Sequence, residues 1–142
     1  MLYNCTHGFV GYHRSLVILY FAVSSWGAYL VTSGRTITNI YQTDFGVYDL
    51  EGPIQEDIQL LNLGYDPETG KGWYVIRMAP GAQTIAHNHR LVEEFLILEG
   101  ELIESDGTIL KPGDFVTYPP GTHHHSRTET GCLLIGIDHD GV

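Results

Sequence analysis

With 142 residues, the chain is long enough to form one domain that buries its own core without disulfide staples. Apolar residues make up 43% of the chain and charged residues 17%, which is ordinary for a soluble globular protein. The formal net charge of −10 and the lack of any basic cluster disfavour binding to nucleic-acid phosphates. Cys5 and Cys132 are the only cysteines, and two distant cysteines do not make a disulfide framework.

Residues 1–35 form an apolar N-terminal extension that differs from the rest of the chain. Residues 15–34 carry no charged side chain, and Arg14 and Arg35 flank this run. The run fits a pair of strands that turn near Trp26, a membrane or secretion segment, or an ill-ordered extension. Serines and glycines interrupt it, so we prefer the strand pair and expect a cytoplasmic protein. Membrane association is disfavoured, although the run leaves it and secretion open.

Residues 36–142 are expected to form a single all-β domain. After a polar connector at residues 36–44, short runs rich in β-branched and aromatic residues alternate with glycine and proline turns. Asp106-Gly107 is a strong hairpin signal. No amphipathic helix pattern and no repeat appear, so the pattern predicts a β-barrel or sandwich. We expect strands at residues 45–51, 57–63, 73–79, 93–105 with a bend at Gly100, 115–121 and 132–138.

A candidate metal site begins at His87 and His89. On a strand, residues two apart share one face, and Glu93 keeps the same parity. Two imidazoles and a carboxylate on one concave surface suit zinc, iron, manganese, nickel or copper. A fourth ligand has to come from elsewhere, and the histidine triple at residues 123–125 offers one inward imidazole.

These two segments resemble the paired motifs of the cupin superfamily. The first motif runs through Gly81, His87, His89, Glu93 and Gly100, and the second through Gly113, Pro119, Gly121 and His124, all at the family spacing. The asparagine that ends the family's second motif is Thr128 here. The resemblance implies a double-stranded β-helix, a jelly-roll-like barrel, with a metal ion inside. It implies as ligands His87, His89, Glu93 and His124.

Residues 54–137 are further similar to the cupin domain of ChrR-type anti-sigma factors. The segments that carry this likeness are TGKGWYVIRMAPGA, EEFLILEGE and GCLLIGID. Such anti-sigma factors have a separate helical domain with its own zinc ligands. Residues 1–35 hold only Cys5, His7 and His13 and show no helical pattern, so we expect a stand-alone cupin rather than a direct anti-sigma role.

Several neighbouring residues are candidates for the substrate pocket and for catalysis. Phe95, Ile97 and Tyr118 are expected to form an apolar wall, although each could equally be plain core. Arg77 could bind a substrate carboxylate by a bidentate pair, but a surface arginine is the more common case. The catalytic base could be Glu93, by moving off the ion, or a hydroxide bound to the ion.

Two classes of function remain open at this point. The resemblance implies a small-molecule metalloenzyme, either a dioxygenase with iron or an isomerase or lyase with zinc, nickel or manganese. The alternative is a non-catalytic sensor or ligand-binding module similar to the ChrR cupin domain. In both cases we expect a small-molecule ligand and a divalent transition metal as cofactor. A homodimer is also expected, because the apolar N-terminal segment needs cover.

Overall fold

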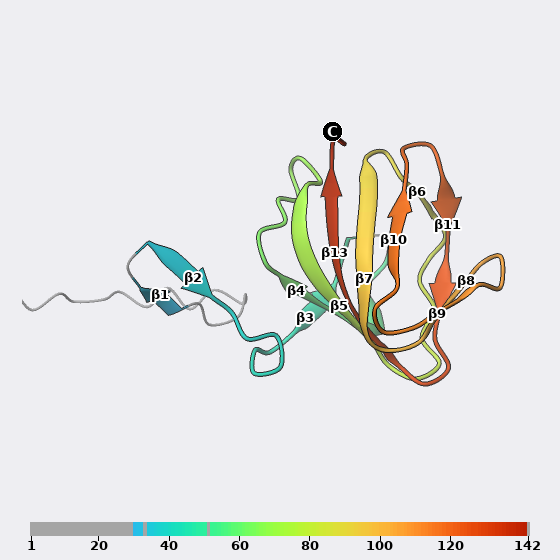
Figure 1. Ribbon diagram of the computed structural model, residues 1–142, viewed down its shortest axis with the longest axis horizontal. Coiled ribbons are helices and arrows are strands. Elements are labelled where there is room, and N and C mark those ends of the chain that lie inside the picture. Colours follow the sequence, from blue (N-terminus) through green and yellow to red (C-terminus); the bar gives the residue numbers. More distant parts are fainter. Residues whose placement is uncertain (1–29, 33, 51, 142) are drawn as a thin grey trace, which may run out of the picture.

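The computed structural model describes residues 30–32, 34–50 and 52–141 of the chain, and Figure 1 shows their arrangement. All regular elements in these ranges are β-strands, so the described part contains no helix that could cross a membrane. Cys5 and most of the extension at residues 1–35 lie outside the described residues. The all-β fold predicted from the sequence is confirmed.

The largest sheet contains six antiparallel strands in the order β10-β7-β13-β5-β4-β3. Its central strands follow the runs predicted from the sequence, to within about two residues at most ends. The bounds are β3 (Gly46–Tyr48), β4 (Gln55–Asn62), β5 (Gly72–Met78), β7 (Val92–Gly100), β10 (Phe115–Tyr118) and β13 (Cys132–His139).

Two smaller sheets complete the barrel, and Figure 1 shows β6, β8, β9 and β11 together on one side, beyond β10. One pairs β6 (His87–Asn88) with β11 (His123–His124), and the other has the order β12-β8-β9. The three strands of this second sheet are β8 (Leu102–Glu104), β9 (Ile109–Leu110) and β12 (Ser126–Arg127). The predicted turn at Asp106-Gly107 joins β8 to β9.

A separate hairpin precedes the barrel. It pairs β1 (Leu30–Thr32) with β2 (Arg35–Ile37), so β2 spans the domain boundary that we predict after residue 35. The predicted connector at residues 36–44 therefore begins inside a strand.

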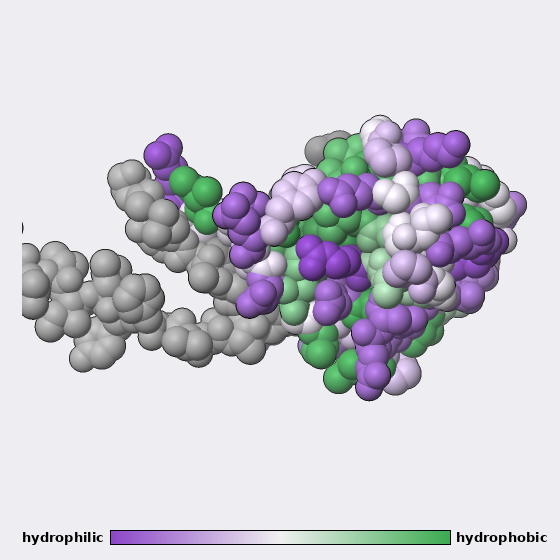
Figure 2. All heavy atoms as spheres, turned by 90° about the horizontal axis from the view of Figure 1, so that it is seen from below, coloured by the Kyte–Doolittle hydropathy of each residue, from purple (hydrophilic) through white to green (hydrophobic). Residues whose placement is uncertain are grey.

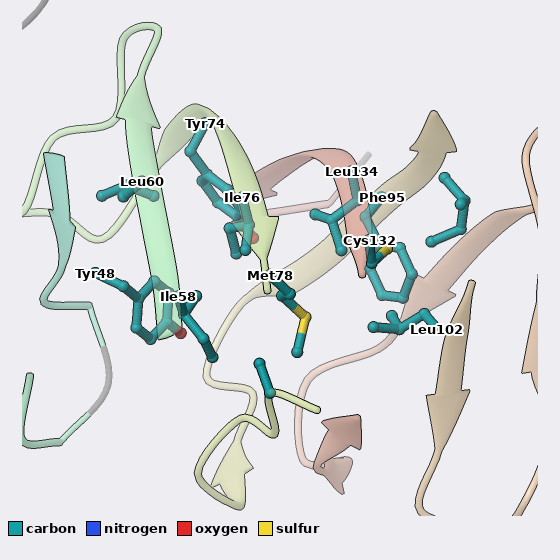
Figure 3. Close-up of a cluster of buried hydrophobic side chains, with 12 residues drawn as sticks. Tyr48, Ile58, Leu60, Tyr74, Ile76, Met78, Phe95, Leu102, Cys132 and Leu134 are labelled. Atoms are coloured by element: carbon teal, nitrogen blue, oxygen red, sulfur yellow. The ribbon is translucent and has the colours of Figure 1, made fainter. Parts of the chain in front are cut away.

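The hydrophobic core lies inside the barrel and follows the two-residue period of its strands. On β5, the side chains of Tyr74, Ile76 and Met78 point inward, and Figure 3 shows them facing side chains from β4, β7 and β13. All members of this inner cluster are at most 8% exposed. They are Tyr48, Ile58, Leu60, Tyr74, Ile76, Met78, Ala82, Phe95, Ile97, Leu102, Cys132 and Leu134.

A second, smaller cluster covers the outer face of the large sheet. Leu61, Val75 and Leu133 are its buried members, and Ile40 and Phe45 from the segment before β3 pack against them. The same three strands therefore bury side chains on both faces. Figure 2 shows a different face, on which hydrophilic and hydrophobic residues are interspersed.

One glycine makes room for a side chain that matters below. Gly136 on β13 lies directly opposite Tyr74 on β5. A Cβ atom at Gly136 would lie 2.5 Å from the Cε2 atom of the Tyr74 ring. Only a residue without a side chain lets the phenol ring lie across β13 and reach the interior.

Candidate metal centre

Four predicted ligands meet at one end of the barrel interior. One ligand atom from each of His87, His89, Glu93 and His124 lies within 4.8 Å of all the others. His87, His89 and Glu93 do not share one strand face as the sequence pattern predicts, because β6 ends at Asn88 and β7 begins in a different sheet. The four side chains converge across the barrel.

Backbone pairing fixes where the three histidines lie. His87 and His124 are direct partners in the β6–β11 ladder. His89 follows β6, and its amide donates to Thr122 O at 2.9 Å while its carbonyl accepts from Gly121 N at 2.8 Å. The two motifs are therefore held together by main-chain hydrogen bonds before any ion is considered.

Hydrogen bonds to Nδ1 orient the rings of His87 and His89. The Nδ1 of His87 lies 2.9 Å from the carbonyl oxygen of Ile85, which can only accept, so this nitrogen carries the proton. The Nδ1 of His89 lies 2.9 Å from Thr122 Oγ1, whose own proton goes to Pro119 O at 2.7 Å. In the neutral rings the Nε2 lone pair is thus left for an ion.

The ring of His124 is oriented by a buried carboxylate that the sequence analysis missed. Glu104 Oε2 accepts from His124 Nδ1 at 2.7 Å and from the Tyr118 hydroxyl at 2.9 Å. Its other oxygen accepts from Ser126 Oγ at 2.9 Å. Glu104 is only 7% exposed, so these bonds form in a low-dielectric interior, where they are strong. Glu104 thereby turns the Nε2 atom of His124 toward the cluster.

Two atoms of the cluster are buried without a hydrogen-bond partner in the described structure, namely His89 Nε2 and Glu93 Oε2. They lie 3.0 Å apart but form no hydrogen bond with each other. Unsatisfied buried polar atoms are costly and are explained when both bind a common ion. Three imidazole nitrogens and one carboxylate oxygen suit a divalent transition metal, so the residues fit such an ion.

Charge is distributed unequally among the four side chains. Burial raises the pKa of Glu93, but contacts with the imidazoles of His124 and His89 outweigh it and hold the pKa well below its usual range. Burial lowers the pKa of His124, whereas the hydrogen bond to Glu104 and the nearby carboxylate of Glu93, 3.5 Å from Nε2, outweigh it and raise the pKa to about 9. Without an ion, the centre therefore contains a carboxylate and an imidazolium at neutral pH. A metal ion would have to displace the proton of His124.

The phenol of Tyr74 holds the second oxygen of Glu93. Its hydroxyl lies 3.0 Å from Glu93 Oε1 and 3.4 Å from Asp138 Oδ1. Burial and the two carboxylates raise the pKa of Tyr74 well above its usual range, so the phenol keeps its proton and donates. Tyr65 packs edge-on against this ring, with 5.7 Å between the centroids.

Comparison with known proteins decides the family. The ChrR Cupin-like domain matches residues 50–139, which is more than half of the chain. The chain belongs to this family of cupins. No curated protein matches it.

Solved structures show the same fold at low sequence identity. A putative ethanolamine utilization protein from Salmonella typhimurium shares 19% identity at a TM-score of 0.63, covering 82% of this cupin and 95% of that chain. The polyketide cyclase RemF from Streptomyces resistomycificus shares 20% identity at a TM-score of 0.56, and the match covers 72% of this cupin and 78% of RemF. A chain in the complex of SigE with the anti-sigma ChrR from Rhodobacter sphaeroides shares 15% identity at a TM-score of 0.54. This match covers 71% of this cupin and 52% of that chain.

Two cavities adjoin the ligands of this cupin. The mouth cavity, of about 80 Å³, extends from His87, His89 and Glu93 toward the exposed residues Asn88 and Arg90. It has room for several waters or for one end of a small organic molecule. The rest of its lining is Tyr48, Leu50, Tyr65, Gly70, Tyr74, Ile76, Leu91 and Asp138.

The inner cavity lies on the core side of the ligands and is smaller, at about 30 Å³. His87 and Glu93 line both cavities, and His124 lines the inner one. Apolar core residues such as Phe95 and Leu134 form most of its remaining wall. The ligand cluster of this cupin thus separates a polar mouth from an apolar interior.

The predicted pocket residues lie in different places. Phe95 lines the inner cavity, whereas Ile97 is a core residue that is 1% exposed and lines neither cavity. Tyr118 packs its ring on His89 and His124, with centroids 5.0 and 4.3 Å away, so it supports ligands.

Arg77, the remaining candidate for the substrate pocket, lines neither of these two cavities. Arg77 lies on the outer face of β5, and its guanidinium carbon is 3.8 Å from the centroid of the Phe45 ring. It lines a separate depression together with Tyr41 and Glu99. Arg77 packs against the outer cluster described above because Val75 and Arg77 share one face of β5.

The remaining members of the second motif have structural positions. His123 is exposed beside the buried His124, and His125 is half-buried. Thr128, which replaces the family asparagine, is 1% exposed. Its hydroxyl accepts from Gly131 N at 3.0 Å, and its amide donates to Ala82 O at 3.0 Å. It therefore stabilises the turn before β13.

Proposed function

We propose that this cupin binds one divalent transition-metal ion through His87, His89, Glu93 and His124 and acts on a small molecule as a metalloenzyme. The observation that carries the proposal is the convergence of four ligand atoms within 4.8 Å, two of them buried and unsatisfied, beside a cavity that reaches exposed residues. The reaction class is either a dioxygenase with iron or an isomerase or lyase with zinc, nickel or manganese.

The ion would supply a Lewis-acid or redox centre when bound. The protein supplies orientation, because each imidazole is fixed by a partner at Nδ1 and Tyr74 holds one oxygen of Glu93. Glu93 is the proposed catalytic base, since it is anionic and lines the mouth cavity. The apolar lining of the inner cavity keeps that side of the cluster poor in water.

The proposal is tested by metal analysis of the purified protein followed by turnover assays. Oxygen uptake is measured with a panel of β-diketones and catechols after loading with iron, and isomerase or lyase activity after loading with zinc, nickel or manganese. The proposal expects metal-dependent turnover that is lost in His124→Ala and kept in His123→Ala, which changes an exposed neighbour. A metal-loaded protein with no turnover on any substrate would contradict the enzyme assignment.

A second candidate function is a non-catalytic sensor or ligand-binding module. The family match favours it, because a domain of this kind occurs in the anti-sigma ChrR, which was solved in complex with SigE. Tightly held zinc, no turnover and a ligand-dependent rise in melting temperature would support this function over the enzyme.

The homodimer and the cytoplasmic location expected from the sequence remain proposals. Large apolar side chains support self-association, since Trp73 is 49% exposed and Phe115 is 61% exposed on the outer face of the large sheet. Sedimentation velocity of the full chain measures the oligomeric state, and a monomer at micromolar concentration would rule the dimer out.

A further inference from the structure

One cation lies at the mouth of the site. Arg90 is exposed and lines the mouth cavity together with His89 and Glu93. It directly follows His89 in the short turn that leads to β7, so its Cα lies about 3.8 Å from that of a proposed ligand. The backbone that places the ion site therefore also places this guanidinium.

The loop at residues 64–71 forms the wall opposite Arg90. Its backbone is fixed by hydrogen bonds from Asp66 N to Lys71 O at 2.7 Å and from Gly70 N to Asp66 O at 2.8 Å. A Cβ at Gly70 would lie 3.7 Å from the Tyr65 hydroxyl oxygen, 3.8 Å from Arg90 Nη2 and 3.9 Å from Leu91 Cδ1. A glycine, which has a φ of +72° here, thus leaves a small cradle between a phenol, a guanidinium and an apolar side chain.

Arg90 differs from three of the four other basic residues within residues 52–141, because only Lys111, which lines neither cavity, also makes neither an ion pair nor a cation–π contact. Within residues 52–141, Lys71 pairs with Asp140 at 2.6 Å and Arg127 with Glu129 at 2.8 Å, whereas Arg77 lies on the Phe45 ring. Arg90 makes no ion pair with any described residue. Its guanidinium can therefore pair with an anion locally, against the general repulsion of a chain of net charge −10.

The wall between this cation and the ligands is continuous. Tyr65 packs edge-on against Tyr74, and the Tyr74 hydroxyl contacts Glu93. Leu50 and Leu91 add apolar surface to the same cavity. A molecule that lies along this wall meets a cation at the rim, then leucine and tyrosine side chains together with the Asp138 carboxylate, and the ligand cluster at the inner end.

We propose that Arg90, with Tyr65 and the cradle at Gly70, forms an anion subsite that selects small organic acids. The substrate class is a molecule with a metal-chelating group at one end and a carboxylate at the other, joined by a short apolar linker. A guanidinium suits the carboxylate because it offers parallel donors to both oxygens. This inference rests on the proposed metal site and adds the chemical class of the ligand.

Two hydroxamates that differ only in their tail test the subsite. The full chain is loaded with Co²⁺, and its visible spectrum is titrated with acetohydroxamic acid and with succinic acid monohydroxamate, which adds a carboxylate. We expect the carboxylated probe to bind about tenfold more tightly to the wild type, as for a charge-assisted hydrogen bond at a partly solvated site. The preference should weaken with added salt.

Variants then assign the preference to Arg90. Arg90→Gln should remove the preference and leave the affinity for acetohydroxamic acid unchanged, whereas Arg90→Lys should keep part of it. Arg127→Gln, an exposed arginine that lines neither cavity, is the matched control and should behave as the wild type. Equal affinities of the two probes in the wild type, or an undiminished preference in Arg90→Gln, would overturn the subsite. Absence of cobalt absorption before any probe is added would instead overturn the metal proposal itself.

Discussion

The two faces of the large sheet bury similar apolar side chains but differ in whether the polar groups near them have partners. On the outer face, Leu61, Val75 and Leu133 are sealed by Ile40 and Phe45, and the guanidinium of Arg77 rests on the Phe45 ring. On the inner face, Tyr74 and Glu93 face three imidazoles, and two of the ligand atoms have no hydrogen-bond partner in the described structure. A satisfied face contributes stability, whereas an unsatisfied, convergent one points to a ligand.

Removing one ligand should give the largest effect on metal binding. We expect His87→Ala to weaken the affinity for Zn²⁺ on the order of a hundred- to a thousandfold, about a quarter of the free energy typical of a four-ligand site. Competition with a chromophoric chelator measures it. His123→Ala, the exposed neighbour of His124, is the control and should change the affinity little. Equal losses in both variants would contradict the assigned ligand set.

A cavity in the outer cluster should affect stability alone. Leu133 is 4% exposed, so Leu133→Ala should lower the free energy of unfolding by about 2–5 kcal/mol. Urea denaturation measures this loss. The Zn²⁺ affinity of the folded variant should stay within about twofold of the wild type, because the residue lies on the far face of β13. A large loss of affinity would show that the two faces are coupled.

The buried carboxylate behind His124 should have an intermediate effect. Glu104→Gln keeps the size of the side chain but removes the charge that orients and polarises the imidazole. We expect a loss of metal affinity of about 10- to 100-fold, as is typical for a partner of a ligating histidine. Glu129→Gln, which changes an exposed carboxylate paired with Arg127, is the matched control. The Glu104 assignment fails if both variants bind Zn²⁺ as the wild type does.

Metal binding should release about one proton per chain at pH 7. The pKa of His124 is raised to about 9 in the metal-free protein, so an ion must displace its proton. Calorimetry in two buffers of different ionisation enthalpy counts this proton. The affinity should rise about tenfold per pH unit between pH 7 and 9 from this group. No proton release would indicate that His124 is neutral before the ion binds.

The metal-free protein should lose stability both in acid, because of Glu93, and in alkali, because of His124. The raised pKa of His124 contributes stability that is fully present below its unfolded value near 6.5 and is lost as the pH rises through about 9. The lowered pKa of Glu93 contributes stability that is present above the unfolded carboxyl value and is lost in acid. Thermal melts of the metal-free chain from pH 4 to 10 measure both limits.

Most of the fold and the ligand cluster could be predicted from the sequence. Turn residues such as Gly100 and Asp106-Gly107 separate the strands, and the spacing of the two cupin motifs predicts the four side chains that converge. The reason for the convergence was not visible, because it depends on the pairing of His87 with His124 across a sheet.

Two features could not be predicted, for different physical reasons. Glu104 precedes a hairpin turn, where an acidic residue is normally solvated, and its pairing with Ser126 opposite the cluster appears only in the β8–β12 register. Arg77 belongs to a strand that is apolar on both faces, so the two-residue period could not say which face is inward. The packing of Phe45 on the outer face decides it.

The central claim is that three imidazoles and one carboxylate bind one ion. X-ray absorption of the zinc-loaded full chain counts the imidazoles directly through their multiple-scattering signal. We predict one Zn²⁺ per chain with three imidazole ligands in the wild type and two in His87→Ala. A wild-type spectrum with fewer than three imidazoles, or one that His87→Ala leaves unchanged, would contradict the account.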